Sequence, residues 1–226
     1  MIGACSTTFN EVDIIGPCIR NLLEQGVERI LVADQSTDGT RDVLREFTEV
    51  GVLVVDGKWH EQERWMNLQA SLLGQGGCDW IVPFDADEFW FGLGTLNDLP
   101  PEMSIVHAEL WHHRDWEHKY VPAERLPKVV FRWAPGATIG PGNHSVTLPS
   151  PFMTRGLEVR HFQFRGLEHF CSKVRSRSER LLPASRARGD GSHITRMDGW
   201  SDKELAAEWS RLTSQEVELC PIPFSR

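Results

Sequence analysis

The stretch IVPFDADEFW, residues 81–90, places three carboxylates within four positions, between one apolar run and the next. Ionised carboxylates are costly in apolar surroundings unless a cation or hydrogen-bond donors accompany them. One interpretation is that Asp85, Asp87 and Glu88 form a solvated acidic loop, as most short charge runs do. The other is that they face a cation at a ligand site, and the sequence on either side of the stretch decides between the two.

Before residue 80 the sequence alternates short apolar runs with amphipathic helical patterns. The predicted strands are 2–6, 29–33, 52–55 and 80–84, and the predicted helices are 14–23, 40–49 and 61–73. Asp13 is predicted to cap the first of these helices. Strands that alternate with helices pair in parallel through right-handed crossovers. The predicted fold class is therefore α/β, with a Rossmann-like, open, twisted, mostly parallel sheet flanked by helices.

Acidic and amide side chains follow the end of every predicted strand. In open α/β sheets the carboxyl ends of the strands form one edge, and ligands bind there. The residues expected at this edge are Asn10, Glu11, Asp34, Asp56, Asp85 and Asp87. Such a convergence favours a cation site over a solvated loop for residues 85–88. We expect Glu88 to hold an Arg or Lys from the later basic segment of the chain.

The chain lacks the two common glycine-rich phosphate motifs. Neither G-x-G-x-x-G after the first strand nor G-x-x-x-x-G-K-[ST] anywhere is present. Hard divalent cations take oxygen ligands and bridge protein carboxylates to substrate phosphates. A cation on the D-x-D carboxylates of residues 85–87 is therefore the natural substitute for a glycine-rich phosphate loop.

The formal net charge of −8 is distributed unevenly along the chain. Residues 1–100 hold 17 acids and 6 Lys or Arg, whereas residues 151–200 hold 10 Lys or Arg and 5 acids. The acidic part suits a metal, the basic segment suits an anion such as phosphate, and the overall sign disfavours binding of nucleic acid. One ligand that carries both metal and phosphate would satisfy both parts.

We expect a cytoplasmic protein, because the sequence has no run apolar enough to span a bilayer and no signal-peptide pattern. Its five cysteines are scattered and form no C-x-x-C, which predicts reduced thiols. Helices are predicted after Gly166 and over 202–212. Basic side chains recur over 175–188 and would suit peripheral contact with anionic lipid, although a plain soluble surface helix explains them as well.

Four segments together resemble family 2 glycosyltransferases of the GT-A fold, which are inverting enzymes that use nucleotide-diphosphate sugars. The segments are TFNE at 8–11, DQSTDGT at 34–40, DADE at 85–88 and HFQFRGLEHFCSK at 161–173. The last one is similar to a bacterial subgroup whose members carry D-A-D-E-F. The resemblance implies one GT-A domain over residues 1–226. Its nucleotide-sugar-binding part would be 1–91, its acceptor-side part with a mixed-sheet extension 92–160, and its basic helix and tail 161–226.

The resemblance also implies roles for individual residues of the donor site. Thr8 and Glu11 would line the nucleotide pocket, and Asp34 would meet the base or the ribose. Asp85 would contact the ribose or the water shell of the metal, and Asp87 would bind Mn²⁺ or Mg²⁺ on the diphosphate. Asp34 could equally be a turn former or a helix cap, which is also the plainer interpretation of Asp38.

The segment at 161–173 would complete that site. By resemblance, His161 is a further metal ligand, and Arg165 and Lys173 bind the diphosphate, where they would stabilise the charge of the leaving group. A histidine in a run with alternating aromatic residues could instead be a structural strand residue.

The acceptor side must supply a base, because an inverting transfer removes the proton of the acceptor hydroxyl during attack. The E-D pair of many family 2 enzymes is absent here. Asp115, Glu117 and His144 are the candidates, with Asp115 and His144 ranked first. Residues 112–118 could also suggest zinc, but their spacing favours a polar acceptor loop in which Trp111 and Trp116 stack on a sugar.

The predicted function is transfer of a sugar from a nucleotide-diphosphate donor to an acceptor hydroxyl with a divalent metal on the D-x-D motif. One alternative is a nucleotide-sugar-binding protein without catalysis, which the missing E-D pair would explain. The other is a D-x-D phosphatase, although such enzymes normally carry the motif on their first strand.

Overall fold

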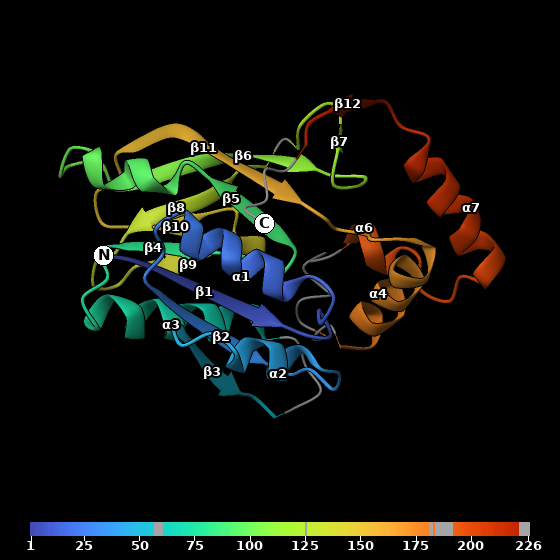
Figure 1. Ribbon diagram of the computed structural model, residues 1–226, viewed down its shortest axis with the longest axis horizontal. Coiled ribbons are helices and arrows are strands. Elements are labelled where there is room, and N and C mark those ends of the chain that lie inside the picture. The colour runs from blue at the N-terminus through green and yellow to red at the C-terminus, as the bar shows by residue number, and fades with distance from the viewer. Residues whose placement is uncertain (57–60, 125, 181–182, 184–191, 222–226) are drawn as a thin grey trace. The chain divides into compact units, whose positions relative to one another are not determined.

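The computed structural model describes residues 1–56, 61–124, 126–180, 183 and 192–221 (Figure 1). These residues separate into two compact units. The first contains residues 1–56, Gln62–Leu110 and Glu124–His161, and the second contains Glu61, Trp111–Ala123 and the described residues from Phe162 onward. Each unit is considered separately below, and the expected single domain over 1–226 stays a prediction.

The first unit is built on an eight-stranded sheet with the strand order β3-β2-β1-β4-β8-β6-β11-β5. Its strands are β1 (Ile2–Thr8), β2 (Arg29–Asp34), β3 (Val50–Val54), β4 (Trp80–Pro83), β5 (Glu88–Phe91), β6 (Ile105–His112), β8 (Lys128–Arg132) and β11 (Met153–His161). Its helices are α1 (Ile15–Glu24), α2 (Thr40–Arg45) and α3 (Gln62–Gln75), with 3₁₀ turns η1 (Leu93–Asp98) and η2 (Pro141–Asn143). A small separate sheet pairs β9 (Thr138–Ile139) with β10 (Val146–Thr147).

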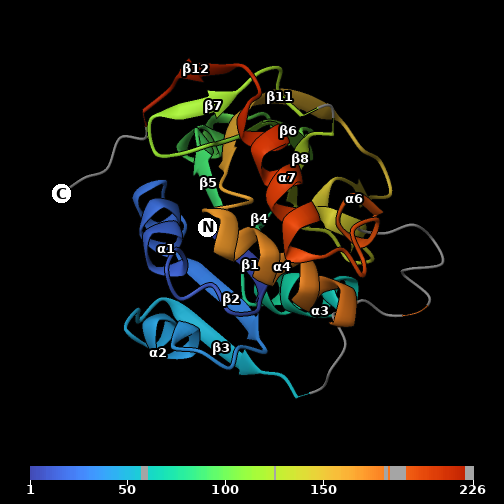
Figure 2. The same ribbon diagram turned by 90° about the vertical axis from the view of Figure 1, so that its right-hand side faces the viewer.

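The two halves of the large sheet differ in strand direction. The strands β3, β2, β1 and β4 are all parallel. On the other side of β4, β8 pairs antiparallel with both β4 and β6, and β11 pairs antiparallel with β5. Figure 2 shows α1 and α2 on one side of the parallel half and α3 on the other. The predicted α/β fold, with a Rossmann-like parallel half and a mixed extension, is confirmed.

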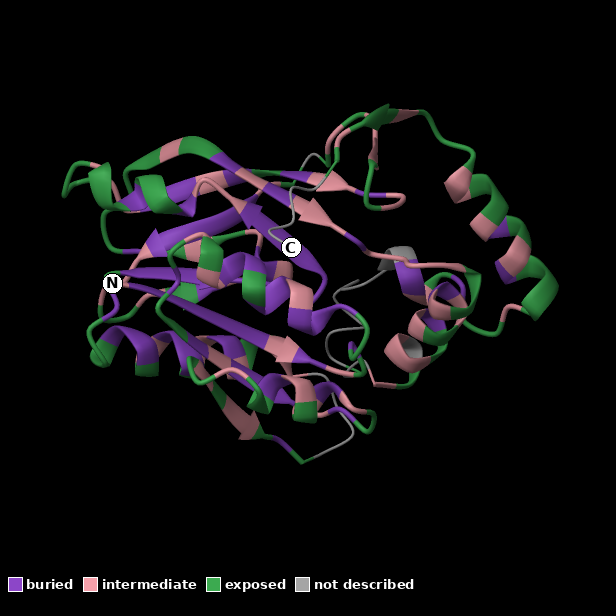
Figure 3. Cartoon of the chain, in the orientation of Figure 1, coloured by how far each residue is buried: buried purple, intermediate pink, exposed green. Residues whose placement is uncertain are grey.

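The core follows the apolar runs of the central strands. Every residue of β4 is buried, and so are all but one of β1, whereas β3 at the edge is half-buried or exposed (Figure 3). One cluster in the first unit packs Cys5, Met66, Ile81 and Phe131 around buried Leu73. Burial of this kind contributes roughly 25 cal/mol per Å² of apolar surface removed from water. All five cysteines are free thiols, as predicted.

Two details of the predicted helices are wrong. Asp13 does not cap α1: the N-cap residue is Ile14, and no side chain bonds to that helix end, because a turn closed by the Glu11 carbonyl precedes the helix. The helix predicted over 40–49 ends at Arg45, since the chain turns over the next residues and β3 begins at Val50.

Polar side chains of α1 cover the outer edge of β5, the last strand of the sheet. Asn21 donates from Nδ2 to the Trp90 carbonyl at 3.1 Å, and its Oδ1 accepts from the Trp90 amide at 2.7 Å. The Cys18 thiol donates to the Glu88 carbonyl at 3.1 Å, and the oxygen of Gln25 accepts from the amide of residue 92 at 2.9 Å. Two α1 side chains and that of the C-cap residue Gln25 thereby satisfy alternate backbone positions that a neighbouring strand would otherwise occupy.

The second unit contains α4 (Leu167–Arg180), α6 (Ser192–Thr195) and α7 (Asp202–Thr213), together with β7 (His118–Tyr120) paired with β12 (Val217–Leu219). Its core packs Phe170, Val174, Ile194, Met197 and Leu205. Among the described residues of both units, no helix is long and apolar enough to cross a membrane. The expected lipid contact at 175–188 lies partly outside the described residues and stays a prediction, as does the cytoplasmic location.

Ser201 begins α7 with a capping box. Its hydroxyl accepts from the Glu204 amide, and a Glu204 carboxylate oxygen accepts from the Ser201 amide at 2.7 Å. We expect Ser201→Ala to lower the free energy of unfolding by about 1 kcal/mol, as loss of an N-cap typically does. Urea denaturation followed by circular dichroism measures this. Ser210→Ala, an exposed change within α7, is the control and should change stability by no more than about 0.5 kcal/mol; equal losses would contradict the assignment.

Candidate functional site

The carboxyl ends of β1 and β2 lie side by side, as predicted, because the register of the two strands pairs Thr8 with Asp34. The Thr8 hydroxyl lies 3.4 Å from the hydroxyl of Ser36. The Asn10 amide donates to the same Ser36 oxygen at 2.9 Å, and the Glu11 amide donates to the Thr40 hydroxyl at 2.9 Å. The loops after the two strands are thus bonded to each other, and they hold Thr8 and Glu11 at one rim of the sheet.

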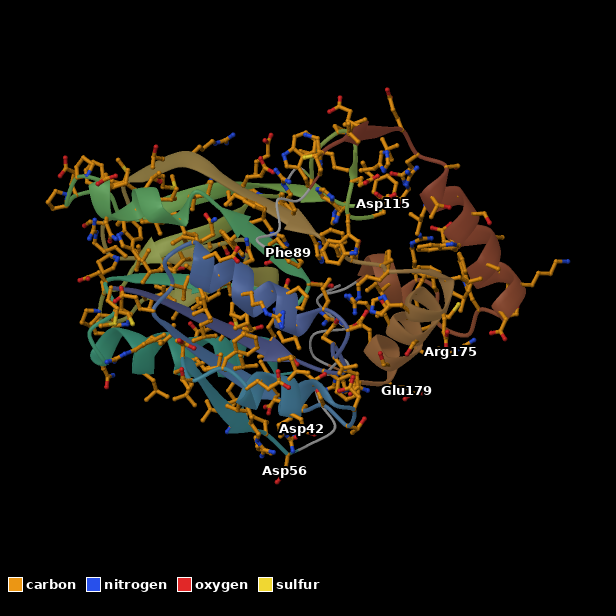
Figure 4. All side chains as sticks on the ribbon, viewed as in Figure 1. Asp42, Asp56, Phe89, Asp115, Arg175 and Glu179 are labelled. Carbon is orange, nitrogen blue, oxygen red and sulfur yellow. The ribbon has the colours of Figure 1, made fainter. Side chains whose placement is uncertain are left out.

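Asp34 is fully buried at the last position of β2. Its Oδ1 accepts from the Ser36 amide at 3.0 Å, and its Oδ2 accepts from Arg41 Nε at 2.7 Å. Asp38 accepts from both the amide and the hydroxyl of Thr40, at 2.9 and 2.6 Å. The interpretation of both acids as turn formers is thereby supported, and a contact of Asp34 with a nucleotide stays a prediction. Asp56 is exposed beyond the end of β3 (Figure 4).

Asp87 and His161 come together from distant parts of the sequence. Asp87 is buried directly before β5, and His161 is the last residue of β11, whose register sets it opposite Glu88. His161 Nε2 lies 3.2 Å from Asp87 Oδ1. The two predicted metal ligands therefore lie next to each other in the structure. Their role as ligands stays a prediction.

The other two acids of residues 85–88, Asp85 and Glu88, both contact a buried lysine, Lys128 of β8. Its Nζ lies 2.7 Å from Asp85 Oδ2 and 2.7 Å from Glu88 Oε1. Burial opposes the charge of Lys128, but the two carboxylates outweigh it and raise the pKa of the amine. Burial raises the pKa of Glu88 to about 8, although Lys128 acts in the opposite direction. Glu88 does hold a basic side chain, but that side chain comes from β8 and not from the later basic segment.

Asp85 has a full set of hydrogen-bond donors within the protein. Besides Lys128, the side chains of Gln62 and Asn143 each donate to Asp85 Oδ1 at 3.1 Å. Burial alone would raise the pKa of Asp85, but the charge of Lys128 reverses the effect and lowers it. A ribose hydroxyl or a metal-bound water would therefore share Asp85 with three existing donors.

His144 follows η2 in a loop of the first unit. Its Nδ1 lies 3.0 Å from the Pro127 carbonyl, which can only accept, so the neutral ring carries its proton on Nδ1 and leaves the lone pair on Nε2. Burial lowers the pKa of His144, and the charge of Lys128 acts in the same direction. Gly142 has a φ of 68°, and a Cβ there would lie 2.8 Å from His144 Cδ2. The ring is therefore oriented and neutral at ordinary pH.

Asp115, the other candidate base, lies in the loop between β6 and β7 in the second unit (Figure 4). Its Oδ1 accepts from the amides of Glu117 and His118, each at 2.9 Å, and from His118 Nδ1 at 2.8 Å. Arg114 Nε donates to Oδ2 at 3.0 Å. Burial works against ionisation, but these donors outweigh it and lower the pKa of Asp115 to about 2. Asp115 is a weak base that orders its own loop.

The remaining predicted residues also lie in the second unit. Arg165 Nη1 donates to the Phe162 carbonyl at 3.4 Å, and Lys173 donates to the Gln163 carbonyl at 3.2 Å. Arg175 on α4, labelled in Figure 4, forms an ion pair with Asp202. Binding of diphosphate by Arg165 and Lys173 stays a prediction.

The two tryptophans expected to stack on a sugar already have partners in the second unit. The Lys119 ammonium lies 3.3 Å from the centre of the Trp111 ring, and the Trp116 ring lies 4.3 Å from that of Phe162. Trp116 keeps 41% of its surface exposed, so it retains a face that a ligand could reach.

A divalent metal is implied by the D-x-D motif, and the donor set allows a direct test of the fit. Among the described residues, no three His, Cys, Asp or Glu side chains gather closely enough to hold a metal by themselves. Two adjacent ligands, Asp87 and His161, suit an ion that arrives with its substrate, because Mg²⁺ is commonly bound by one or two carboxylates plus phosphate oxygens and waters. The residues present fit such an ion.

Sequence reasoning missed Lys128, Asn143 and Gln62. A weak signal for Lys128 existed: it begins the apolar run KVVFR, and a lysine within a buried strand requires an acidic partner. The sequence contains no comparable signal for Asn143, whose burial and φ of 61° depend on how its loop folds.

Three solved structures are distantly similar to this chain. A nucleotidyl transferase from Methanothermobacter thermautotroptrophicus is 14% identical over 57% of this chain and 70% of that one, with a TM-score of 0.34. HddC from Yersinia pseudotuberculosis is 10% identical over 59% and 71%, with a TM-score of 0.37. A mannose-1-phosphate geranyltransferase from Thermus thermophilus is 12% identical over 92% and 67%, with a TM-score of 0.35. Such scores do not establish a common fold.

Comparison of sequences is more informative. No curated protein matches the chain. Residues 4–93, however, match the family model described as glycosyl transferase family 2. The match includes the segments 8–11, 34–40 and 85–88, which bring Thr8, Asp34 and Asp87 to the rim, and it supports a transferase that uses nucleotide sugars. Over residues 4–93, the chain is therefore similar to glycosyl transferase family 2.

Proposed function

We propose that the protein is an inverting glycosyltransferase that moves a sugar from a nucleotide-diphosphate donor to an acceptor hydroxyl. The observation that carries the proposal is the Asp87–His161 pair, 3.2 Å apart beside the D-x-D segment of a chain whose residues 4–93 match glycosyl transferase family 2. Neither a Rossmann-like sheet nor a D-x-D motif alone would support this function, because many unrelated activities use each of them.

Asp87 and His161 would hold the divalent ion, Mn²⁺ or Mg²⁺. When bound, that ion would neutralise charge on the diphosphate as the sugar departs. The buried Asp87 supplies a negative charge at a fixed position, and His161 Nε2 lies 3.2 Å from its Oδ1. Two protein ligands leave the other coordination positions to phosphate oxygens and water.

Thr8, Glu11 and Asp34 are proposed to face the nucleoside. Support comes from the register that sets Thr8 beside Asp34 and from the bonds that join their loops. Asp85 is proposed as the ribose-side partner, in addition to its three donors within the protein. Arg165 and Lys173 are proposed to bind the diphosphate, which their positive charges suit.

His144 is proposed as the base that takes the proton of the acceptor hydroxyl. An effective base must be unprotonated at working pH and still bind the proton well. The pKa of Asp115 at about 2 makes that carboxylate a poor proton acceptor, whereas the neutral His144 ring directs its Nε2 lone pair away from the Pro127 carbonyl. Of the two candidates ranked from the sequence, His144 is therefore preferred.

The test is a panel of nucleotide-diphosphate sugars, offered with Mn²⁺ or with EDTA. We expect one donor to be hydrolysed slowly in the absence of an acceptor, only with metal, and to release the sugar in the anomeric form opposite to that in the donor. NMR of the first product distinguishes the two anomers before they interconvert. Retention of configuration would contradict the inverting mechanism. Tight donor binding in calorimetry without turnover across a broad acceptor library would instead identify a binding protein.

A further inference from the structure

Three consecutive residues after β9 are each bonded to the D-x-D segment or to the start of β8. The Gly142 carbonyl accepts from Lys128 Nζ at 2.9 Å. Asn143 Nδ2 donates to Asp85 Oδ1 at 3.1 Å, and His144 Nδ1 donates to the carbonyl of Pro127, the neighbour of Lys128, at 3.0 Å. Residues 142–144 therefore have few ways to move independently of Asp85.

The contacts form a closed ring through Lys128, Asp85, Asn143 and the Gly142 carbonyl. Lys128 and Asn143 are 2% and 1% exposed, so these two members of the ring are shielded from water, whereas the Asp85 side chain is 30% exposed. The ammonium donates to Asp85 and to the Gly142 carbonyl, and it forms an ion pair with Glu88 at 2.7 Å. A planar guanidinium would not match this arrangement, which makes the position specific for lysine.

We propose that Lys128 and Asn143 are positioning residues that fix His144 relative to the D-x-D segment, so that the base and the donor site keep one geometry. This inference rests on the proposed function. A buried ion pair seldom adds net stability over apolar residues of the same size, and its best-attested use is to specify one arrangement. Here the arrangement specified is that of residues 142–144 against Asp85.

The central experiment replaces Lys128 by Met, which keeps the length of the side chain and removes its charge. We expect kcat per folded molecule to fall about a hundredfold, because a misplacement of about 1 Å can have that effect. KM for the donor should change less than kcat, since Asp85 is the one proposed donor residue that Lys128 contacts in the bonds described above, and Asp85 keeps its donors Gln62 and Asn143. Asn143→Ala should shift kcat in the same direction.

Two controls separate positioning from loss of stability. Leu22→Ala removes a fully buried side chain of α1 and destabilises the fold by about 2–5 kcal/mol without touching the ring. Lys203→Met removes an exposed lysine of α7. Both should keep kcat per folded molecule near that of the unchanged protein. If Leu22→Ala lowers kcat as much as Lys128→Met does, the effect is structural and the inference fails.

A double variant tests whether Lys128 acts through His144. If it does, adding Lys128→Met to a His144→Gln protein should cause little further loss of kcat. The effects of substitutions on residues that act as a unit do not add. A full additional hundredfold loss would mean that Lys128 acts elsewhere and would overturn the inference.

A readout independent of activity is the pKa of His144 measured by NMR of the imidazole nitrogens, with His144→Gln used for assignment. The charged groups that affect His144 are Lys128 on β8, Asp85 after β4 and Glu124 before β8. Lys128 lowers the pKa and the two acids raise it, so Lys128→Met should move the pKa upward, and Lys203→Met should leave it unchanged. An unmoved pKa in Lys128→Met would contradict the ring geometry.

The outcomes also separate this inference from the proposed function. If no nucleotide sugar is turned over by the unchanged protein but the pKa of His144 rises in Lys128→Met, the proposed function fails and the ring geometry stands. If the unchanged protein is active and Lys128→Met retains its kcat and its pKa, the positioning role fails and the proposed function stands.

Discussion

Asp87→Asn is expected to reduce kcat/KM for the nucleotide-sugar donor by about a thousandfold, which corresponds to roughly 4 kcal/mol of transition-state stabilisation. The carboxylate is buried beside His161, so an amide keeps its shape and removes only the charge that would hold the cation. Activity should be measured against Mn²⁺ concentration, and we expect saturation to require far more metal than in the unchanged protein.

The matched control is Asp42→Asn, a carboxylate on α2 that is exposed and paired only with Arg45 in the described structure (Figure 4). Surface ion pairs of this kind contribute about 0–1 kcal/mol, so the control should keep both activity and metal dependence. Binding of Mn²⁺ in the presence of a nucleoside diphosphate, followed by calorimetry, gives a second readout. Unchanged activity in Asp87→Asn would remove the metal site from the proposal.

His144→Gln is expected to lower kcat by about a hundredfold to ten-thousandfold, the usual contribution of a general base. Glutamine keeps a hydrogen-bonding side chain at the same position but accepts no proton. Donor affinity should persist, because Asp87 and His161 are unchanged. A comparable loss in Asp115→Asn, with His144→Gln fully active, would reverse the ranking of the two candidate bases.

The pH dependence of kcat/KM is a second test of His144 as the base. A base acts only when it is unprotonated, so kcat/KM should fall as the pH drops through the pKa of His144. Because burial and Lys128 lower that pKa from its ordinary value of 6.5, the midpoint of the decline should lie below pH 6.5. In His144→Gln the part of the decline that reports this residue should disappear from the pH profile of the residual activity. A decline centred near pH 2 would point to Asp115.

The parallel half of the sheet was predictable because each strand and helix there has its own clear periodicity. The order of strands, and with it the meeting of Thr8 and Asp34, follows from that alternation and from the handedness of the crossovers. Helix ends were less predictable: α2 stops at Arg45 because the chain turns into β3, which local propensity does not reveal.

Residues of the candidate site were predictable from the sequence only where they belong to a motif of the family that the chain resembles. The resemblance suggested both Asp87 and His161, and the structure brings them together. The partner of Glu88 was assigned to the wrong segment, because the antiparallel pairing of β8 with β4, which brings Lys128 to the D-x-D segment, has no local signature. Asp115 looked like a base because a sequence shows the charge of an acid but not the backbone amides that saturate it.

The side chains of α1 along β5 have a consequence for association with other chains. An open strand edge is a template for pairing, and it is a common starting point for domain swapping and aggregation. At one edge of the sheet, the backbone of residues 88–92 is already hydrogen-bonded to Cys18, Asn21 and Gln25. At the other edge, β3 pairs only with β2 among the described residues, and its Val54 is exposed. Unwanted strand addition should therefore begin at β3, and charged substitutions meant to improve solubility belong there.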